Sequence, residues 1–266
     1  MTQTVLVTGA SSGIGQATAL LLKREGFTVF GTTRRPDAIG KQEFSMVALD
    51  VRSDDSVKAC FDDVFSKAGR LDVLIDCAGY ALTGAAEETT VAEAKAQFET
   101  NFWGAVRVVN AALPAMRAAR AGKIIIIGSL AGLTAIPFSA FYSATKFALE
   151  GYAEALWQEV RPFGIHVTLV EPGFVRTRLS EASQVAAGPL PVYEAFEKRA
   201  LRAIGGAVER GIPPERVAQS VLGIVQSDQP RLRYRVGAQA TWLPRLKQVA
   251  PWSMYAKGVR RTFGLD

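Results

Sequence analysis

The sequence predicts an α/β fold, a doubly wound parallel sheet of about seven strands with helices on both faces. Three observations lead to this expectation. Apolar strand-like runs alternate with helix-like stretches along the chain of 266 residues. The run Ile124–Ile127 is apolar at every position, which is typical of a parallel strand buried on both faces. A glycine-rich turn follows the first strand-like run, and open α/β sheets bind ligands at the ends of their strands.

The strand-like runs read TVLVT, TVFGTT, SMVAL, DVLID, KIIIIG and IHVTLV in chain order. Their apolar and β-branched residues predict strands at 4–8, 28–33, 45–49, 72–76, 123–128 and 165–170, with a late strand near 233–236. Helix-like stretches lie between them, at about 14–25, 54–68, 90–119, 139–163 and 214–227.

The segment 180–212 breaks this alternation, because it has no clean period. We interpret it as a substrate loop inserted after the sixth strand, where such loops commonly cover a ligand crevice. With 48% hydrophobic residues the chain can bury one large core, so we expect residues 1–240 to form a single domain. The turn-forming residues in the loop are Gly188, Pro189, Pro191, Gly205 and Gly206.

Basic side chains concentrate at the end of the chain. The formal net charge is +6, and residues 231–266 carry eight Lys or Arg against one acid, Asp266. The preceding 230 residues carry 23 basic and 24 acidic side chains, so the body is nearly neutral. We expect no nucleic-acid partner, because the body lacks a basic face and no nucleic-acid-binding module is present.

Residues 241–266 form a predicted basic, amphipathic extension. Pro244 and Pro251 are expected to divide it into two short helices. Two interpretations remain open: the extension lies on an anionic membrane surface, or it packs on its own domain or on a partner subunit. The apolar residues that can share one face are Trp242, Leu243, Leu246, Val249 and Trp252.

Several other classes of protein do not fit the sequence. The N-terminus opens directly into a strand-like run, so we expect no signal peptide, and no run approaches the roughly 20 apolar residues of a membrane span. Two isolated cysteines, Cys60 and Cys77, make no disulfide framework and indicate the cytoplasm. The single histidine, His166, leaves little for a zinc site or a histidine-based triad, so we expect no metal.

A phosphate-binding loop is predicted between the first strand and the first helix, where the chain reads TGASSGIG from Thr8 to Gly15. The glycines allow a tight turn and a close approach of the backbone to a ligand, and the helix N-terminus offers free N–H groups to a pyrophosphate. Rossmann-type sheets bind dinucleotides at this junction. The expected cofactor contacts are Gly9, Ser11, Ser12, Gly13, Ile14 and Gly15.

Tyr142 and Lys146 form a candidate catalytic pair, with Ser129 upstream. Residues four apart share one face of a helix, so Lys146 can hold its charge near the Tyr142 hydroxyl. A nearby cation favours the phenolate, which makes the tyrosine a suitable proton donor near neutral pH. The pair alone is weak evidence, because tyrosines and lysines are common on exposed helix faces.

Taken in order, these motifs resemble those of the short-chain dehydrogenase/reductase family. The TGxxxGxG spacing matches its cofactor loop, and Ser129, Tyr142 and Lys146 match its catalytic serine, tyrosine and lysine. The resemblance covers about residues 2–240 and implies a catalytic role for Asn101. It also implies cofactor contacts at Asp50, Val51, Ala78, Gly79, Pro172, Gly173, Val175 and Thr177, besides Tyr142 and Lys146.

One position departs from the family pattern. The family usually shows Asn-Asn-Ala-Gly after the fourth strand, and this chain has Asp76, Cys77, Ala78 and Gly79. Ala78 and Gly79 still allow a small, close backbone, but we expect other hydrogen bonds to stabilise the sheet here. We interpret Cys77 as a small buried residue rather than as a nucleophile.

The end of the second strand indicates NADP(H). NAD-dependent relatives carry an acid there, which accepts from the ribose 2′-hydroxyl and repels a 2′-phosphate. Thr33 stands in its place, followed by Arg34 and Arg35. Because a guanidinium suits a phosphate dianion, we expect Arg34 to bind the 2′-phosphate and Thr33 to make a weaker contact. The alternative is that both arginines are ordinary surface residues.

The resemblance implies an oxidoreductase that transfers a hydride between NADP(H) and a lipophilic carbonyl or secondary alcohol. Tyr142 is then the general acid or base, Ser129 binds the substrate oxygen, Lys146 also binds the nicotinamide ribose, and Asn101 positions a water. The pattern is most similar to the 17β-hydroxysteroid and retinol dehydrogenase branch, which is fold-level analogy. Candidate pocket residues are Phe138, Phe141, Phe174, Leu179, Leu190, Val192 and Phe196, with Arg176 and Arg178 near the entrance.

Two alternative functions share this fold. A catalytically silent, NADP(H)-sensing binding protein typically lacks the tyrosine or the lysine, which this chain keeps. A sugar-nucleotide epimerase or dehydratase usually has a larger C-terminal substrate domain than this chain can form. The helix expected at 139–163 is similar to the family's dimer helix, which implies a homodimer or homotetramer. The protein is expected to be cytoplasmic, with membrane association left open.

Overall fold

The structure contains the predicted doubly wound sheet. It is a computed structural model that describes residues 2–177 and 183–266. Seven parallel strands follow the order β3-β2-β1-β4-β6-β7-β9, and the strand order reverses beside β1. The bounds are β1 Thr4–Val7, β2 Thr28–Thr33, β3 Ser45–Ala48, β4 Val73–Asp76, β6 Gly122–Ile127, β7 Ile165–Pro172 and β9 Arg233–Val236.

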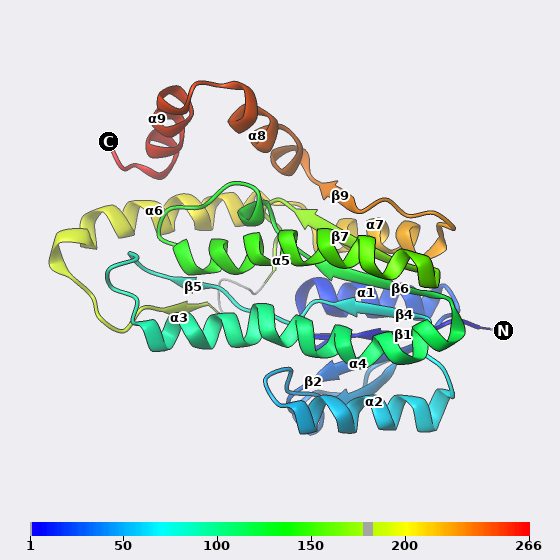
Figure 1. The fold of residues 1–266 in the computed structure, drawn as a ribbon. Coiled ribbons are helices and arrows are strands. Elements are labelled where there is room, and N and C mark those ends of the chain that lie inside the picture. The colour runs from blue at the N-terminus through cyan, green and yellow to red at the C-terminus, as the bar shows by residue number, and fades with distance from the viewer. Residues whose placement is uncertain (1, 178–182) are drawn as a thin grey trace.

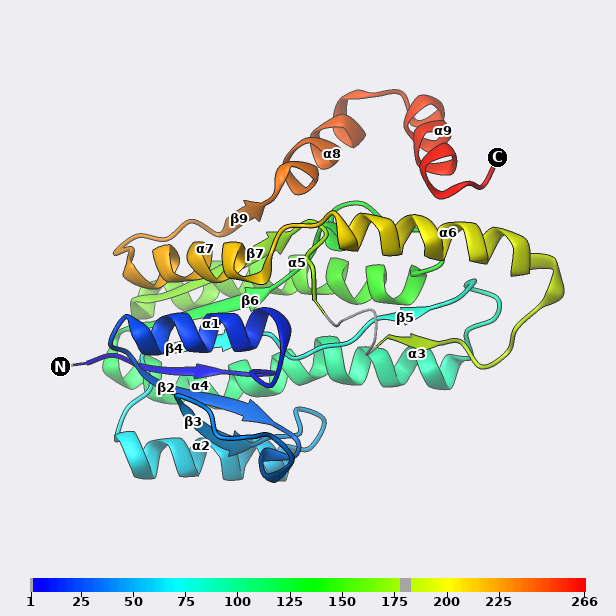
Figure 2. The ribbon, with the colours of Figure 1, turned by 180° about the vertical axis from the view of Figure 1, so that it is seen from behind.

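Helices cover both faces of this sheet (Figures 1 and 2). α2, α4 and α5 pack on one face with Leu6, and α1 and α7 pack on the other with Val5 and Val7. Alternate residues of β1 thus enter opposite cores, as the two-residue period of a strand requires. The helices are α1 Gly13–Arg24, α2 Asp54–Ala68, α3 Val91–Phe98, α4 Gly104–Ala119, α5 Ala140–Val160, α6 Pro191–Glu209, α7 Pro214–Gln226, α8 Ala238–Val249 and α9 Trp252–Phe263.

The stretch 90–119, expected as one helix, is interrupted. α3 opens with a capping box between Thr90 and Glu93. It then passes into a π-helical segment, Glu99–Trp103, before α4 begins. A π turn carries more residues per turn than an α-helix, so it shifts the face on which the following side chains lie. Asn101 lies in this segment and is 1% exposed.

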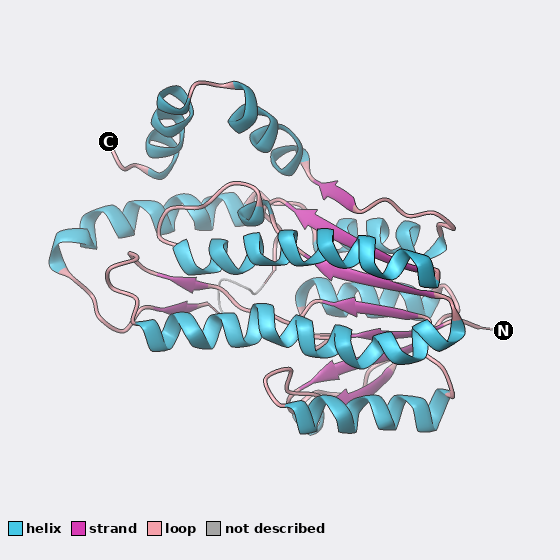
Figure 3. Cartoon of the chain, viewed as in Figure 1, coloured by secondary structure: helices cyan, strands magenta, loops and turns pink. Residues whose placement is uncertain are grey.

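The expectation of a loop over 180–212 is wrong for much of that segment. β8, Gln184–Val185, pairs with β5, Leu82–Thr83, in a second small sheet (Figure 3). The long helix α6 follows. Ala200 is its only described residue that is fully buried. Pro191 occupies the first turn, where a missing N–H removes no helical hydrogen bond, and the two helix-weakening glycines lie near the other end.

The C-terminal arm, residues 238–266, contains α8 and α9 and lies along one side of the molecule (Figure 1). Pro251 separates the two helices as predicted, but Pro244 lies inside α8 and does not end it. The inner side of the arm packs on its own domain: Tyr255 is buried, and the Lys247 ammonium donates to the Leu133 carbonyl at 2.9 Å. None of the described helices has the length and apolar content that crossing a bilayer requires.

Candidate active site

Ser129, Tyr142 and Lys146 line one cavity of about 580 Å³. Ser129 follows β6, and Tyr142 and Lys146 lie on one face of the first turns of α5. The Lys146 ammonium is 5.9 Å from the Tyr142 ring centroid and donates to the Ile127 carbonyl at 2.8 Å. The Lys146 side chain is 8% exposed. The fold therefore keeps a buried cation beside the tyrosine, and the predicted pair and serine share a wall.

Asn101 lies behind this wall and does not line the cavity. Its Oδ1 accepts from the Tyr80 N–H at 3.0 Å, and its Nδ2 donates to the Tyr80 carbonyl at 2.9 Å. Nδ2 also lies 3.3 Å from Oγ1 of Thr145, the residue before Lys146. The π segment thus fastens the loop after β4 to α5. That Asn101 positions a water remains a prediction.

The predicted phosphate loop forms a cradle in which side chains have no room. Gly9 has φ +62°, and a Cβ there would lie 3.1 Å from the Cys77 carbonyl oxygen. A Cβ on Gly15 would lie 2.4 Å from the Gly9 carbonyl oxygen. Ser12 precedes α1 without capping it through its side chain, and no acid stands in the first turn, so the free N–H groups suit a pyrophosphate. The loop residues that line the cavity are Gly9, Ser11, Ser12, Gly13, Ile14 and Gly15.

The far end of the cavity carries a second arginine that the sequence analysis missed. Thr33, Arg34 and Arg52 line this end. Arg52 binds Asp50 through Nε at 2.9 Å and through Nη2 at 2.6 Å, and this hydrogen bonding lowers the pKa of Asp50 to about 2. Asp50, expected to contact the cofactor, is thus an anion at neutral pH and is already paired with a cation. The spacing of Asp50 and Arg52 in the sequence is only a weak signal for an arginine at this site, since acid–arginine pairs are common on protein surfaces.

Asp76 and Thr8 explain how the departure after the fourth strand is accommodated. The Thr8 hydroxyl donates to the Asp76 carboxylate at 2.6 Å and accepts from the N–H groups of Cys77 and Ala78 at 3.0 Å each. This relay ties the end of β1 to the chain after β4 beside the phosphate loop. Burial raises the pKa of the Asp76 carboxyl and of the Cys77 thiol, which argues against a nucleophilic cysteine.

The segment after β7 closes the cavity opposite the phosphate loop. The Thr177 methyl group would be 3.4 Å from a Cβ built on Gly13, so the segment reaches the loop itself. The remaining predicted cofactor contacts also line the cavity: Val51, Ala78, Gly79, Pro172, Gly173, Val175 and Thr177.

Of the predicted pocket residues that the structure describes, only Phe174 lines the cavity. It is joined by Leu130, Ile136, Ile204 and Val208. The last two come from α6, whose helical form the sequence analysis did not anticipate. Arg178 and Leu179 lie outside the described residues. The other predicted pocket and entrance residues do not line the cavity: Phe138, Phe141, Arg176, Leu190, Val192 and Phe196.

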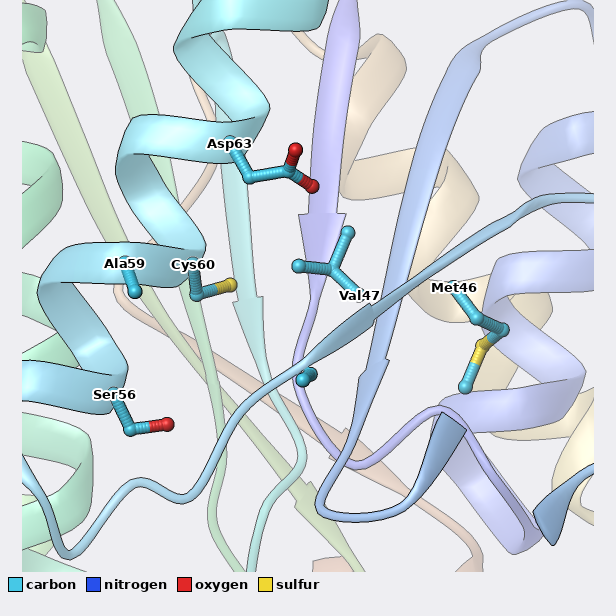
Figure 4. A pocket seen from close by; sticks show the side chains of 7 residues that line it. Met46, Val47, Ser56, Ala59, Cys60 and Asp63 are labelled. Atoms are coloured by element: carbon cyan, nitrogen blue, oxygen red, sulfur yellow. The ribbon is translucent and has the colours of Figure 1, made fainter. Parts of the chain in front are cut away.

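A second hollow of about 290 Å³ lies between β3 and α2 (Figure 4). Cys60 and Asp63 lie on its α2 side, with Met46 and Val47 across from them. Burial raises the pKa of the Cys60 thiol to about 12, so this cysteine is not a nucleophile at neutral pH. The hollow contains none of the predicted catalytic residues.

Two buried carboxyl groups lie beside the catalytic wall. Glu150 follows Lys146 by one turn of α5, and Glu171 comes directly before Pro172 at the end of β7. Neither Glu171 Oε1 nor Glu150 Oε1 has a hydrogen-bond partner among the described residues. Arg233 contacts both carboxyls, with Nε 2.9 Å from Glu150 and 3.5 Å from Glu171. Burial, and after it the charge of Glu150, raises the pKa of Glu171 to about 7.

Replacing Glu171 with Gln should flatten the pH dependence of stability. Because the folded protein holds a proton on Glu171 that the unfolded chain releases near pH 4.5, this carboxyl stabilises the fold most at low pH and loses that contribution as pH rises toward 7. As the pH rises from about 5 to about 8, the free energy of unfolding of Glu171→Gln should increase by roughly 2 kcal/mol relative to that of the native chain.

Urea unfolding at both pH values measures the effect. Glu154→Gln is the matched control, because Glu154 pairs with the same Arg233 but its side chain is 62% exposed. Parallel pH profiles for the native chain and Glu171→Gln would show that Glu171 is ionised throughout.

Known proteins with similar sequences show what this fold and site resemble. A family model described as short chain dehydrogenase matches residues 3–187, which include every predicted catalytic position. The chain is 40% identical over 253 residues to 3-ketodihydrosphingosine reductase of Bacteroides thetaiotaomicron, covering 91% of this chain and 93% of that protein. It is 34% identical over 278 residues to retinol dehydrogenase 8 of Bos taurus, covering 96% of this chain and 88% of that one.

A solved structure agrees over the whole length. The crystal structure of a short-chain dehydrogenase from Streptomyces avermitilis matches with a TM-score of 0.86 at 32% identity, covering 100% of this chain and 98% of that one. The likeness therefore extends through the C-terminal arm.

Proposed function

Since this chain belongs to the short-chain dehydrogenase family and is an oxidoreductase of that family, we propose that it uses NADP(H) and acts on a lipophilic carbonyl or the corresponding secondary alcohol. The observation that carries the proposal is the shared cavity, which has Tyr142, Lys146 and Ser129 at one end and Arg34 at the other. The glycine cradle and the uncapped start of α1 between them suit a dinucleotide.

In the proposed mechanism a bound nicotinamide supplies or accepts the hydride. Tyr142 gives a proton to the substrate oxygen during reduction and takes it back during oxidation. Ser129 donates a hydrogen bond to that oxygen and stabilises its developing charge. Lys146 holds its ammonium 5.9 Å from the centre of the Tyr142 ring and would hydrogen-bond to the ribose of a bound cofactor, as the resemblance implies. Asn101 holds the surrounding loops in place through its bonds to Tyr80.

The preference for NADP(H) follows from the charge at the ribose end. Thr33 leaves no carboxylate where one would repel a 2′-phosphate, and Arg34 offers a guanidinium to it. Arg52 adds a second cation nearby, although its charge is partly balanced by Asp50. Two arginines at this end favour the phosphorylated dinucleotide.

The lipophilic substrate class follows from the apolar lining at the other end. Ile204 and Val208 contribute branched aliphatic side chains from α6, and Phe174 contributes an aromatic ring. The two named relatives, a 3-ketodihydrosphingosine reductase and a retinol dehydrogenase, bear names of lipophilic substrates. We therefore favour a ketone, aldehyde or alcohol with a long apolar chain.

The proposal is tested by NADPH oxidation with the purified protein across a panel of ketones and aldehydes of increasing chain length. Turnover that rises with chain length supports it. Tight NADPH binding without turnover on any carbonyl would contradict it and favour the cofactor-sensing alternative.

Replacing Ile204 with Trp should shorten the pocket. We expect kcat/KM for a long-chain ketone to fall by about 10- to 100-fold, while that for a short-chain ketone stays within about threefold, because the larger ring excludes only the distal part of the chain. Val192→Trp is the matched control, since Val192 lies on the same helix, is 70% exposed and does not line the cavity. Equal losses for both chain lengths would remove Ile204 from the substrate pocket.

We also propose a cytoplasmic homodimer or homotetramer. Support comes from the two free cysteines, Cys60 and Cys77, and from the exposed Phe147 on α5, the helix that is similar to the family's dimer helix. Sedimentation velocity of the purified chain measures the assembly, and a monomer at micromolar concentration would contradict this part.

A further inference from the structure

The C-terminal arm presents an apolar stripe to solvent. On α8, Trp242, Leu246 and Val249 recur at the spacing of one helix face, and all are exposed. After Pro251, Trp252 and Met254 at the start of α9 are exposed as well. These five side chains are between 41% and 81% exposed. A surface helix ordinarily buries its apolar face against the protein, whereas α8 presents its apolar face to solvent.

The arm is held in this orientation by contacts on its inner side. Tyr255 is buried under α9, and Lys247 lies 5.1 Å above the Phe147 ring while donating to the Leu133 carbonyl. The Arg199 guanidinium on α6 donates to the Gly264 carbonyl at 2.6 Å. Polar and aromatic groups thus anchor the inner side, which leaves the apolar stripe outward in the folded protein.

Cations accompany the exposed stripe. Arg245 lies within it on α8, and Lys257, Arg260 and Arg261 are exposed on α9. Asp266 is the only acid in residues 231–266, and it pairs with Arg260. Within the described part of the chain no acidic side chain forms an ion pair with Arg245 or Arg261. The outer surface of the arm is therefore both apolar and cationic.

We propose that this outer surface of the arm docks on an anionic lipid bilayer. Two exposed tryptophans beside arginine and lysine side chains form the composition that inserts into the headgroup region and attracts anionic lipids. A second copy of this chain fits less well, because an isologous contact would bring the two basic arms together. The positive charge of the arm therefore favours an anionic bilayer over a second copy of the chain as its partner.

The position of the arm gives this docking a consequence for the cavity. α6 contacts the end of the arm, because Arg199 donates to the Gly264 carbonyl just after α9. The same helix lines the cavity through Ile204 and Val208. An arm seated on a bilayer would place α6 near the membrane surface. A long-chain substrate would then pass from the bilayer to the cavity over a short distance through water.

Co-sedimentation of the full chain with vesicles tests the proposal. We expect the protein to bind vesicles of three parts phosphatidylcholine to one part phosphatidylglycerol about tenfold more strongly than vesicles of phosphatidylcholine alone. Trp242→Ser/Trp252→Ser should reduce binding to the anionic vesicles about tenfold. Trp103→Ser is the matched control, since Trp103 is exposed to the same 49% as Trp242 but lies on the π segment.

A second pair of variants tests the charges without changing apolar surface. Arg245→Glu/Arg261→Glu should abolish the preference for anionic vesicles, whereas Lys23→Glu/Arg24→Glu, at the end of α1, should keep it. Native protein that stays in the supernatant with anionic vesicles would overturn the proposal. So would equal binding by arm and control variants, or a native dimer that Trp242→Ser/Trp252→Ser converts to a monomer without vesicle binding by either.

Discussion

Tyr142→Phe is expected to lower kcat by about 10³-fold, and to leave the Kd for NADPH within about threefold, because a positioned acid contributes about 10²–10⁴-fold to such reactions. Phenylalanine removes the proton that Tyr142 would transfer but keeps the ring. The ring faces the Lys146 ammonium, 5.9 Å from the centroid, so most of the local packing stays. Stopped-flow turnover and NADPH fluorescence titration separate the two quantities.

Tyr152→Phe provides the control for this experiment. Tyr152 lies on the same helix, and its buried hydroxyl has no hydrogen-bond partner among the described residues. Removing an unpaired hydroxyl costs little, so Tyr152→Phe should keep near-native turnover. If Tyr142→Phe kept turnover comparable to Tyr152→Phe, the proton would have to come from another group.

Arg34→Ala is expected to raise the Kd for NADPH by about 10- to 100-fold and to change that for NADH little, because each hydrogen bond to a charged group contributes about 1.5–3 kcal/mol. The guanidinium lines the ribose end of the cavity, where Thr33 offers only a neutral hydroxyl. The loss should also shrink at high salt, because salt screens the attraction between Arg34 and the 2′-phosphate, which the native chain has and the variant lacks.

Arg35→Ala is the matched control for the cofactor switch. Arg35 is adjacent and exposed but does not line the cavity. We expect its replacement to change the Kd for NADPH by less than about threefold, since exposed charges away from a site contribute little. A larger effect from Arg35 than from Arg34 would reassign the phosphate contact, and equal NADPH and NADH affinities in the native chain would remove the basis for NADP(H).

The sheet and the cavity loop could be predicted because their signals are local. A buried parallel strand such as 123–128 requires apolar residues at successive positions, and the glycines near Gly9 and Gly15 are required by close backbone contacts. The Tyr142 and Lys146 pair needs only helical spacing to share a face. The helix α6 was missed because Pro191, Gly205 and Gly206, which are typical of loops and turns, lie inside it.

Other parts of the site depend on contacts between distant residues. Ile204 and Val208 enter the cavity because α6 packs over it, and the link between Asn101 and Tyr80 needs the π segment to turn inward. No spacing rule specifies such contacts in advance.

The sequence by itself determined the parallel α/β sheet and the order of the motifs along it, because these follow from residue period and short-range spacing. The catalytic candidates came from the resemblance of those motifs to the family. The tertiary structure alone decided which apolar residues line the cavity, that Glu150 and Glu171 meet in one buried cluster, and that the apolar face of α8 points outward. Those outcomes depend on how separate elements pack, and packing is a property of residues far apart in the chain.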